Sequence, residues 1–246
     1  MINITEDQVN DILERFDKAE YVYGDLRFYC MKSQYEDEFE DEFTDLVYTI
    51  GADDYDAGMS KIVFRFEEYP DFIVKIPITG YRRYSEVLDD DGDLVEWEEN
   101  ESFLYTRASS FPDVEKWDYC GEEARIYEQA RKRHVECMFA ETKFIGRTKS
   151  GFPIYVSEFI PDGSSQMTRK KKDIYLSLAK EEHISTNGFG QYLVAEMLAS
   201  YPVSIVMDAI NFMRAYRIDS DLHDNNYRFD EDGKFIIIDY SNFNDF

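Results

Sequence analysis

Apolar residues recur at two different spacings along the chain, and the change of spacing predicts the order of its elements. Helical spacing comes first, and an amphipathic helix is predicted by the capping box Thr5-Glu-Asp-Gln8 and by the apolar positions Val9, Ile12, Leu13 and Phe16. Short β-type runs at 47–50, 61–66 and 72–76 follow, and they predict an antiparallel meander. The acidic segment 35–45 fits either a helix or a solvated loop.

The acidic segment 79–118 interrupts this pattern and predicts an inserted hairpin. Its turn-forming run, Asp89-Asp-Asp-Gly-Asp93, lies between two β-type runs. The aspartates resemble part of a calcium loop, but Val87 stands five positions before Gly92, where that loop needs an aspartate. We therefore do not expect calcium to bind at this turn.

The second half of the chain is predicted to be mainly helical, with strands before and after the helices. A helix is expected at 122–134, two strands at 142–146 and 154–160, helices near 166–180, 189–200 and 203–216, and a final strand pair at 227–229 and 235–239. No internal repeat or low-complexity linker divides the chain. This order of elements predicts an α+β fold.

Composition and charge restrict the classes of function. A hydrophobic content of 43%, with 16% aromatic residues, is ample for a buried core, and a net charge of -25 opposes binding to nucleic acids and to anionic membranes. The same charge suits a partner with a basic surface. The start of the chain has no secretory signal, and the most apolar stretch, 192–213, is interrupted by Glu196, Pro202 and Asp208. We expect a cytoplasmic protein whose three cysteines, Cys30, Cys120 and Cys137, are reduced.

Three oxygen-bearing side chains near the end of the chain carry the candidate chemistry. Asn226 follows Asp221 by five positions, and Asp239 ends the last predicted strand. Phosphoryl transfer needs a carboxylate near the attacking hydroxyl and oxygen ligands for magnesium, and these residues supply both. Asp and Asn are also common in turns and caps, so a purely structural role for all three remains open. A transition-metal site made by Asp219, Asp221 and His223 is another alternative.

Together with the preceding elements, these residues resemble the protein-kinase-like superfamily. The spacing of Asp221 and Asn226 matches the kinase catalytic loop, and the form Asp221-Leu-His223-x-x-Asn226 is most similar to small bacterial and bacteriophage kinases and to aminoglycoside phosphotransferase-like enzymes. The resemblance covers roughly residues 47–241. It implies a bilobal fold with a β-rich N-lobe and a truncated helical C-lobe. We accordingly expect an N-terminal helical extension at 1–46, an N-lobe at 47–160 that contains the insertion 79–118, and a reduced C-lobe at 161–246.

The resemblance also implies ATP and Mg²⁺ as ligands and a role for each matching residue. Asp221 would orient or deprotonate the acceptor hydroxyl, and Asn226 and Asp239 would hold magnesium. Lys75 would contact the α- and β-phosphates and pair with Glu123, with Glu122 as the alternative partner. The remaining nucleotide contacts would come from the loop between Gly51 and Gly58 and from the hinge-like Glu158, Phe159 and Ile160. Taken singly, Lys75 also fits a lysine that reaches the surface from any sheet, and Glu123 a solvated helix residue.

Three features depart from the family pattern. Asp219-Ser220 replaces the His-Arg pair before the catalytic aspartate, and Asp239-Tyr240-Ser241 replaces D-F-G. Three carboxylates lie between Gly51 and Gly58, where they would repel phosphates. The chain ends at Phe246, seven residues after Asp239, without the region that binds peptide substrates in protein kinases. We expect the acceptor to be recognised by the N-terminal helix, the 79–118 insertion, the 164–216 region or a second subunit.

Two hypotheses from different classes follow. The first is a minimal ATP- and magnesium-dependent phosphotransferase, either of the Ser/Thr kinase type or acting on a small-molecule hydroxyl. The second is a pseudokinase or an acidic interaction protein of bacteriophage type that binds a basic surface of a partner protein.

Overall fold

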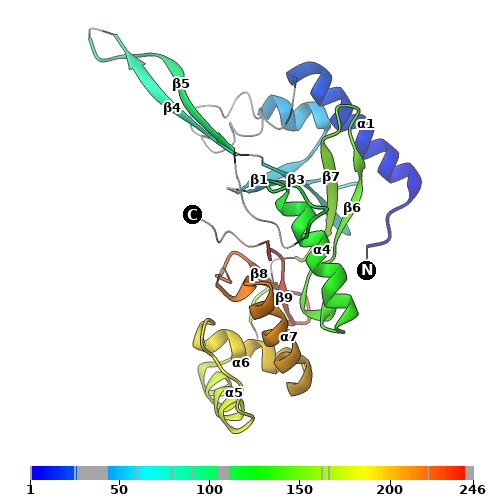
Figure 1. The fold of residues 1–246 in the computed structure, drawn as a ribbon, viewed down its shortest axis with the longest axis vertical. Coiled ribbons are helices and arrows are strands. Elements are labelled where there is room, and N and C mark those ends of the chain that lie inside the picture. The colour runs from blue at the N-terminus through cyan, green and yellow to red at the C-terminus, as the bar shows by residue number, and fades with distance from the viewer. Residues whose placement is uncertain are drawn as a thin grey trace. The chain divides into compact units, whose positions relative to one another are not determined.

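The computed structural model describes residues 2–24, 26, 44–58, 60–78, 80–89, 91–104, 111–161, 163–165, 167–220 and 222–241. The chain forms two compact units (Figure 1). The sheet unit contains Ile2–Gly121 and Lys143–Ser157, and the helical unit is built mainly from Glu122–Thr142 and Glu158–Phe246. The chain therefore passes from one unit to the other three times. The predicted α+β class is confirmed, whereas the predicted boundaries at residues 46 and 160 stay predictions.

A five-stranded sheet and a long helix make up the core of the sheet unit. The strand order is β1-β2-β3-β7-β6, with β1 at Asp54–Ala57, β2 at Lys61–Arg65, β3 at Phe72–Pro77, β6 at Thr142–Arg147 and β7 at Pro153–Glu158. Strands β1, β2 and β3 pair antiparallel in sequence order, which confirms the predicted meander. Its second and third strands lie where the apolar runs predicted them.

The first strand of the meander was predicted in the wrong place. Residues 44–50 are helical, and β1 begins after them. Leu46 and Ile50 are both buried, and their spacing of four places them on one face of a helix. Gly51, at φ 68°, ends this helix, where its N–H donates to the Tyr48 carbonyl and the Ala52 N–H donates to the Val47 carbonyl.

Helix α1 (Glu6–Tyr23) begins at the predicted capping box and packs into the core of the sheet unit. The Gln8 N–H donates to Thr5 Oγ1, and the Thr5 N–H donates to the Gln8 side chain. Ile12 and Phe16 belong to the same buried cluster as the sheet residues, and the ring of Phe16 meets that of Phe64 edge-on at 5.6 Å. The helix is therefore part of the core of this unit.

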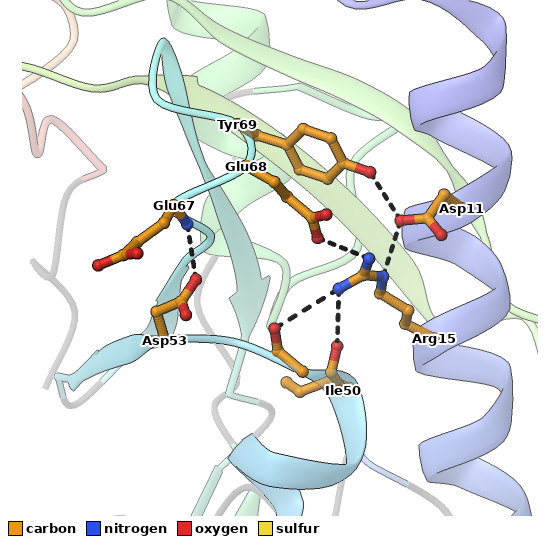
Figure 2. A network of polar contacts seen from close by, with 8 residues as sticks. Asp11, Arg15, Ile50, Asp53, Glu67, Glu68 and Tyr69 are labelled. Carbon is orange, nitrogen blue, oxygen red and sulfur yellow. Dashed lines mark hydrogen bonds and ion pairs between the residues drawn. The ribbon is translucent and has the colours of Figure 1, made fainter.

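Arg15, on α1, holds three segments of the sheet unit together (Figure 2). Its guanidinium forms ion pairs with Asp11 at 2.7 Å and with Glu68 at 2.6 Å. It also donates to the carbonyls of Ile50 and Gly51, at the end of the 44–50 helix. These carbonyls have no partner within their own helix, so the arginine acts as a C-terminal cap supplied by a distant segment.

We expect Arg15→Met to lower the free energy of unfolding by about 1–2 kcal/mol, because it removes several charge-assisted hydrogen bonds while keeping the apolar stem. Chemical denaturation measures this loss. Lys149→Met is the matched control, since the Lys149 side chain is 86% exposed and its 3.3 Å pair with Asp17 should contribute under about 1 kcal/mol. Equal losses in the two variants would contradict the bridging role of Arg15.

The predicted insertion is a hairpin of β4 (Gly80–Leu88) and β5 (Leu94–Leu104), seen in Figure 1 as a long two-stranded ribbon. These strands pair only with each other among the described strands. At the turn, Asp89 Oδ1 accepts the N–H groups of Asp91 at 3.0 Å and Asp93 at 2.9 Å, and Gly92 has a φ of 86°. Asp89 is thus used to close the turn.

The helical unit contains the remaining predicted elements. They are most of α4 (Tyr119–Lys132), the helices α5 (Arg169–Glu181), α6 (Gln191–Ser200) and α7 (Val203–Ala215), and the strands β8 (Tyr227–Phe229) and β9 (Phe235–Ile237). The unit also contains two short 3-10 helices that were not predicted, η2 (Glu136–Met138) and η3 (Ile218–Ser220). Each predicted helix and strand of this region is confirmed. Among the described helices, none combines the length and the apolarity needed to cross a bilayer. Cys120 and Cys137 are free thiols, and Cys30 lies outside the described residues.

Asp118 caps the start of α4 from a buried position. Its Oδ1 accepts the Gly121 N–H at 2.8 Å, and its Oδ2 accepts the Tyr155 hydroxyl at 2.5 Å. Burial raises the pKa of Asp118 from 3.8 to about 6, against the opposing effect of these two hydrogen bonds. The cap of α4 is therefore charged above about pH 6 and neutral well below it.

The raised pKa predicts a pH-dependent stability. Between about pH 4 and pH 6 the folded protein binds more protons at Asp118 than the unfolded chain, so the contribution of this group to stability falls by about 2–3 kcal/mol as the pH rises through that interval. Asp118→Asn can still cap the helix and should remove this fall, so that its stability relative to the wild type is greater at pH 7 than at pH 4. Denaturation at several pH values, with Asp208→Asn on the exposed surface as control, measures the difference. Parallel curves for the Asp118 variant and the wild type would refute the assignment.

Candidate functional site

The candidate site lies at the open end of the β8–β9 hairpin, in the helical unit. The hairpin is closed by a turn in which Asp230 Oδ1 accepts the N–H groups of Asp232 at 3.0 Å and Lys234 at 2.8 Å. Gly233 adopts the left-handed conformation there, at φ 77°. The rings of Tyr227 and Phe235 lie 4.9 Å apart across the two strands. Local sequence therefore fixes the register that aligns the residues before β8 with those after β9.

Asn226 and Asp239 are brought together by main-chain hydrogen bonds. The Asn226 carbonyl accepts the N–H of Ile238 at 2.9 Å and of Asp239 at 3.2 Å, and its own N–H donates to the His223 carbonyl at 2.9 Å. Asn226 is buried, and Asp239 is partly buried. Although they are thirteen positions apart in the sequence, the two predicted metal ligands are adjacent in space.

The donor chemistry of this pair fits magnesium. An amide oxygen and a carboxylate are hard oxygen ligands, and a magnesium ion bound in proteins keeps several waters and uses few protein ligands. The hydroxyl of Ser241 donates to Asp239 Oδ1 at 3.4 Å, which orients the carboxylate. Asp221, predicted as the catalytic residue, lies outside the described residues.

The alternative transition-metal site receives no support from His223. Its Nδ1 accepts the Asn225 N–H at 3.3 Å, so this nitrogen takes part in the turn before β8. Within the described part of the chain, no three His, Cys, Asp or Glu side chains gather as ligands for a metal. Because Asp221 lies outside the described residues, its role in such a site stays a prediction.

Glu123 is fully buried and linked to the residue after Asp239. The Thr142 hydroxyl donates to Glu123 Oε2 at 3.4 Å, and the Tyr240 hydroxyl lies 3.2 Å from the same threonine and 2.7 Å from the Ala140 carbonyl. Burial, reinforced by the nearby Glu123 carboxylate, raises the pKa of the Tyr240 phenol well above its usual value. The interpretation of Glu123 as a solvated helix residue is wrong. Its neighbour Glu122 is also buried.

Lys75 lies on β3 and is only 3% exposed, so it does not extend to the protein surface. Its position on the third strand of the meander is the one that the kinase resemblance implies for the phosphate-binding lysine. Lys75 belongs to the sheet unit and Glu123 to the helical unit. The ion pair between them stays a prediction.

The predicted hinge leads directly from β7 into the helical unit. The Glu158 N–H donates to the Glu141 carbonyl at 2.9 Å, and Glu158 Oε2 accepts the Glu141 N–H at 3.4 Å. No other described residue forms a hydrogen bond with the Ile160 main chain. Phe159 and Ile160 are both partly buried.

The sequence predicted that Gly51 and Gly58 lie in one loop between two strands, and this prediction is wrong. Gly51 ends the 44–50 helix, whereas Gly58 follows β1 and donates its N–H to the Lys61 carbonyl at 2.9 Å in the turn to β2. Two of the three carboxylates between them, Asp54 and Asp56, are exposed on β1 itself. The third, Asp53, accepts the Glu67 N–H at 2.6 Å (Figure 2). Nucleotide contacts by the two glycines stay predictions.

No structural role was predicted from the sequence for Thr142, Tyr240 or Gly163. Tyr240 was visible as an aromatic residue directly after the candidate metal ligand, but Thr142 had no local signal. Gly163 donates its N–H to the Phe229 carbonyl at 3.0 Å, and a Cβ atom there would overlap that carbonyl and lie 2.6 Å from the Asp230 carbonyl. The segment after the hinge is therefore held against the end of β8 by a contact that requires glycine.

We expect Gly163→Ala to destabilise the protein by about 1–3 kcal/mol, because the added methyl group must displace backbone atoms. Thermal or chemical unfolding measures this effect. Gly58→Ala, in the turn from β1 to β2, is the matched control, since its added methyl group would meet the Lys61 carbonyl at 3.6 Å, an ordinary van der Waals contact, and the change should stay within about 0.5 kcal/mol. A Gly163 variant as stable as this control would disprove the close approach.

No protein-family model matches the chain, and comparisons with curated proteins and with solved structures find no match either. The kinase-like interpretation therefore depends on the residues and geometry of this chain alone.

Proposed function

We propose that this protein is an ATP- and magnesium-dependent phosphotransferase with a protein-kinase-like, bilobal arrangement. The observation that carries the proposal is the pair of main-chain bonds from Ile238 and Asp239 to the Asn226 carbonyl. These bonds bring together an amide and a carboxylate that match the two magnesium-binding residues of kinases in type and in sequence order. The order of the other elements supports the same interpretation: a meander with a lysine on its third strand, then a helix with a buried glutamate.

The residues divide into three roles under this proposal. Asn226 and Asp239 hold magnesium, which when bound screens the charge of the phosphates. Lys75 positions the phosphates and is itself oriented by Glu123. Asp221 orients the acceptor hydroxyl and takes its proton as the phosphoryl group is transferred.

The adenine ring would bind to the main chain of the hinge segment. An adenine edge needs a main-chain donor and acceptor that are not already used. The N–H and carbonyl of Ile160 meet this requirement with respect to the described residues. Partly buried Phe159 and Ile160 add apolar surface next to these groups.

A second candidate is favoured by the charges on β1. The exposed carboxylates of Asp54 and Asp56 precede the turn at Gly58 and would repel a triphosphate if it lay against this turn. A pseudokinase that binds a basic partner protein would tolerate them. Nucleotide binding separates the two candidates.

We expect ATP with magnesium to raise the midpoint of thermal unfolding, whereas ATP alone should raise it much less. At a ligand concentration about 100 times its Kd, the stabilisation is about 2.7 kcal/mol, or roughly 5–10 °C for a chain of this size. Asp239→Asn should abolish the magnesium-dependent part of the shift. Asp208→Asn makes the same charge change on an exposed position of α7 and should behave like the wild type.

Turnover distinguishes catalysis from binding. Asp221→Asn should keep the thermal shift with magnesium and ATP while abolishing phosphoryl transfer or slow ATP hydrolysis. A shift without any turnover in the wild type would favour the pseudokinase. The absence of a shift in every condition would refute the nucleotide site.

A further inference from the structure

The tip of the β4–β5 hairpin combines exposed apolar side chains with carboxylates. Leu88 and Leu94 stand opposite each other in the register and are 50% and 51% exposed, and Val95 is 62% exposed. Asp89, Asp91 and Asp93 are exposed in the turn between them. A two-stranded ribbon alone is marginally stable in water, and its edges invite pairing. The tip therefore has the composition of a contact surface.

A pocket of complementary composition lies in the helical unit, between α5, α6 and the β8–β9 turn. Its volume is about 550 Å³. The apolar part of the lining consists of Met167, Ile174, Tyr175 and Ala199, and the cationic part of Lys171 and Lys234. Ile174 is 61% exposed, so the pocket presents apolar surface to solvent beside its lysines.

Basic residues surround this pocket, although the protein has a net charge of -25. The first turn of α5 carries Arg169, Lys170, Lys171 and Lys172 and no acidic residue. Cations at a helix N-terminus oppose the helix dipole, so carboxylates brought to this end would stabilise α5. The basic turn and the pocket thus favour the same kind of ligand, one with carboxylates around an apolar centre.

The carboxylates of the pocket have different environments. Glu196 is buried, pairs with Lys172 Nζ at 2.5 Å and accepts the Ser165 hydroxyl at 2.7 Å, so its charge is balanced within the unit. Asp232, on the β8–β9 turn, is exposed and would repel an acidic ligand. Removing the charge of Asp232 should therefore strengthen the binding of an acidic ligand, whereas removing a lysine should weaken it.

We propose that the hairpin tip of one copy of the protein occupies this pocket in a second copy. Leu88 and Leu94 would cover Ile174 and Tyr175, and the turn aspartates would approach Lys171 and Lys234. The contact buries two exposed apolar patches at once and brings further carboxylates to the basic first turn of α5. It is independent of the phosphotransferase proposal, because neither surface includes a residue assigned to phosphoryl transfer.

The two surfaces are different, so the association is head-to-tail and builds rings or open chains. The net charge of -25 opposes it at long range. At physiological ionic strength, charges more than about 8 Å apart are largely screened, and the local complementarity can then dominate. We therefore expect association at physiological salt that depends on protein concentration.

Sedimentation equilibrium of the full chain, without any added ligand, tests the proposal. The wild type should show a mass above 29.1 kDa that increases with concentration. Leu88→Ser with Leu94→Ser should weaken the association at least about tenfold, as should Lys171→Glu with Lys234→Glu. Asp232→Asn should strengthen it. Glu181→Lys with Glu182→Lys, at the end of α5 away from the pocket lining, should have no comparable effect.

A charge exchange guards against misfolded variants. Asp91→Lys with Asp93→Lys should weaken association alone, and a mixture of this variant with the Lys171→Glu, Lys234→Glu variant should associate again, because each carries one half of an exchanged contact. A protein that stays monomeric at every concentration would overturn the proposal. So would association that the tip and pocket variants leave unchanged, or a mixture that fails to recover it.

Discussion

The double hydrogen bond to the Asn226 carbonyl is the contact on which the candidate site depends. Strands β8 and β9 have three residues each, too few for a hairpin that is stable by itself. Its turn is closed by Asp230, and the tilted rings of Tyr227 and Phe235 are in contact across its strands. Strand β9 is also bound to the segment after α4, where the Ala140 N–H donates to the Ile237 carbonyl at 2.8 Å. Because both ends are fixed, Asn226 and Asp239 are held together before any ligand binds, which limits the entropy lost on binding.

Buried polar groups extend this site into the core of the helical unit. A buried carboxylate is costly unless hydrogen bonds or charges compensate for lost solvation. Glu123 is linked through Thr142 to Tyr240, which is followed by Ser241 and preceded by Asp239. Tyr240 also packs edge-on against Phe139 at 5.2 Å. A short chain of hydrogen bonds and ring contacts would therefore transmit a change in the position of α4 to Asp239.

Much of the secondary structure could be predicted because its signals are local. The capping box of α1, the apolar runs of β2 and β3 and the Asp-rich turns all depend on neighbours within a few residues. The residues 47–50 alone fit a strand, whereas the spacing of Leu46 to Ile50 is helical. The links between Tyr240 and Thr142 and between Gly163 and Phe229 join residues 98 and 66 positions apart, so no local pattern could reveal them. The catalytic role of Asp221 stays a prediction from spacing alone.

The three crossings of the chain between the sheet unit and the helical unit limit how the protein can be divided. The segment 1–121 lacks β6 and β7, which would leave β3 as an unprotected edge of an incomplete sheet. The segment 158–246 lacks the part of α4 with Glu123 and the residues that bind Tyr240. Neither unit is a continuous piece that could be expressed, inherited or exchanged by a simple cut. The sheet unit is complete once β7 has been synthesised, whereas the helical unit and the predicted metal ligands can assemble only after the 89 residues of the segment 158–246 have followed.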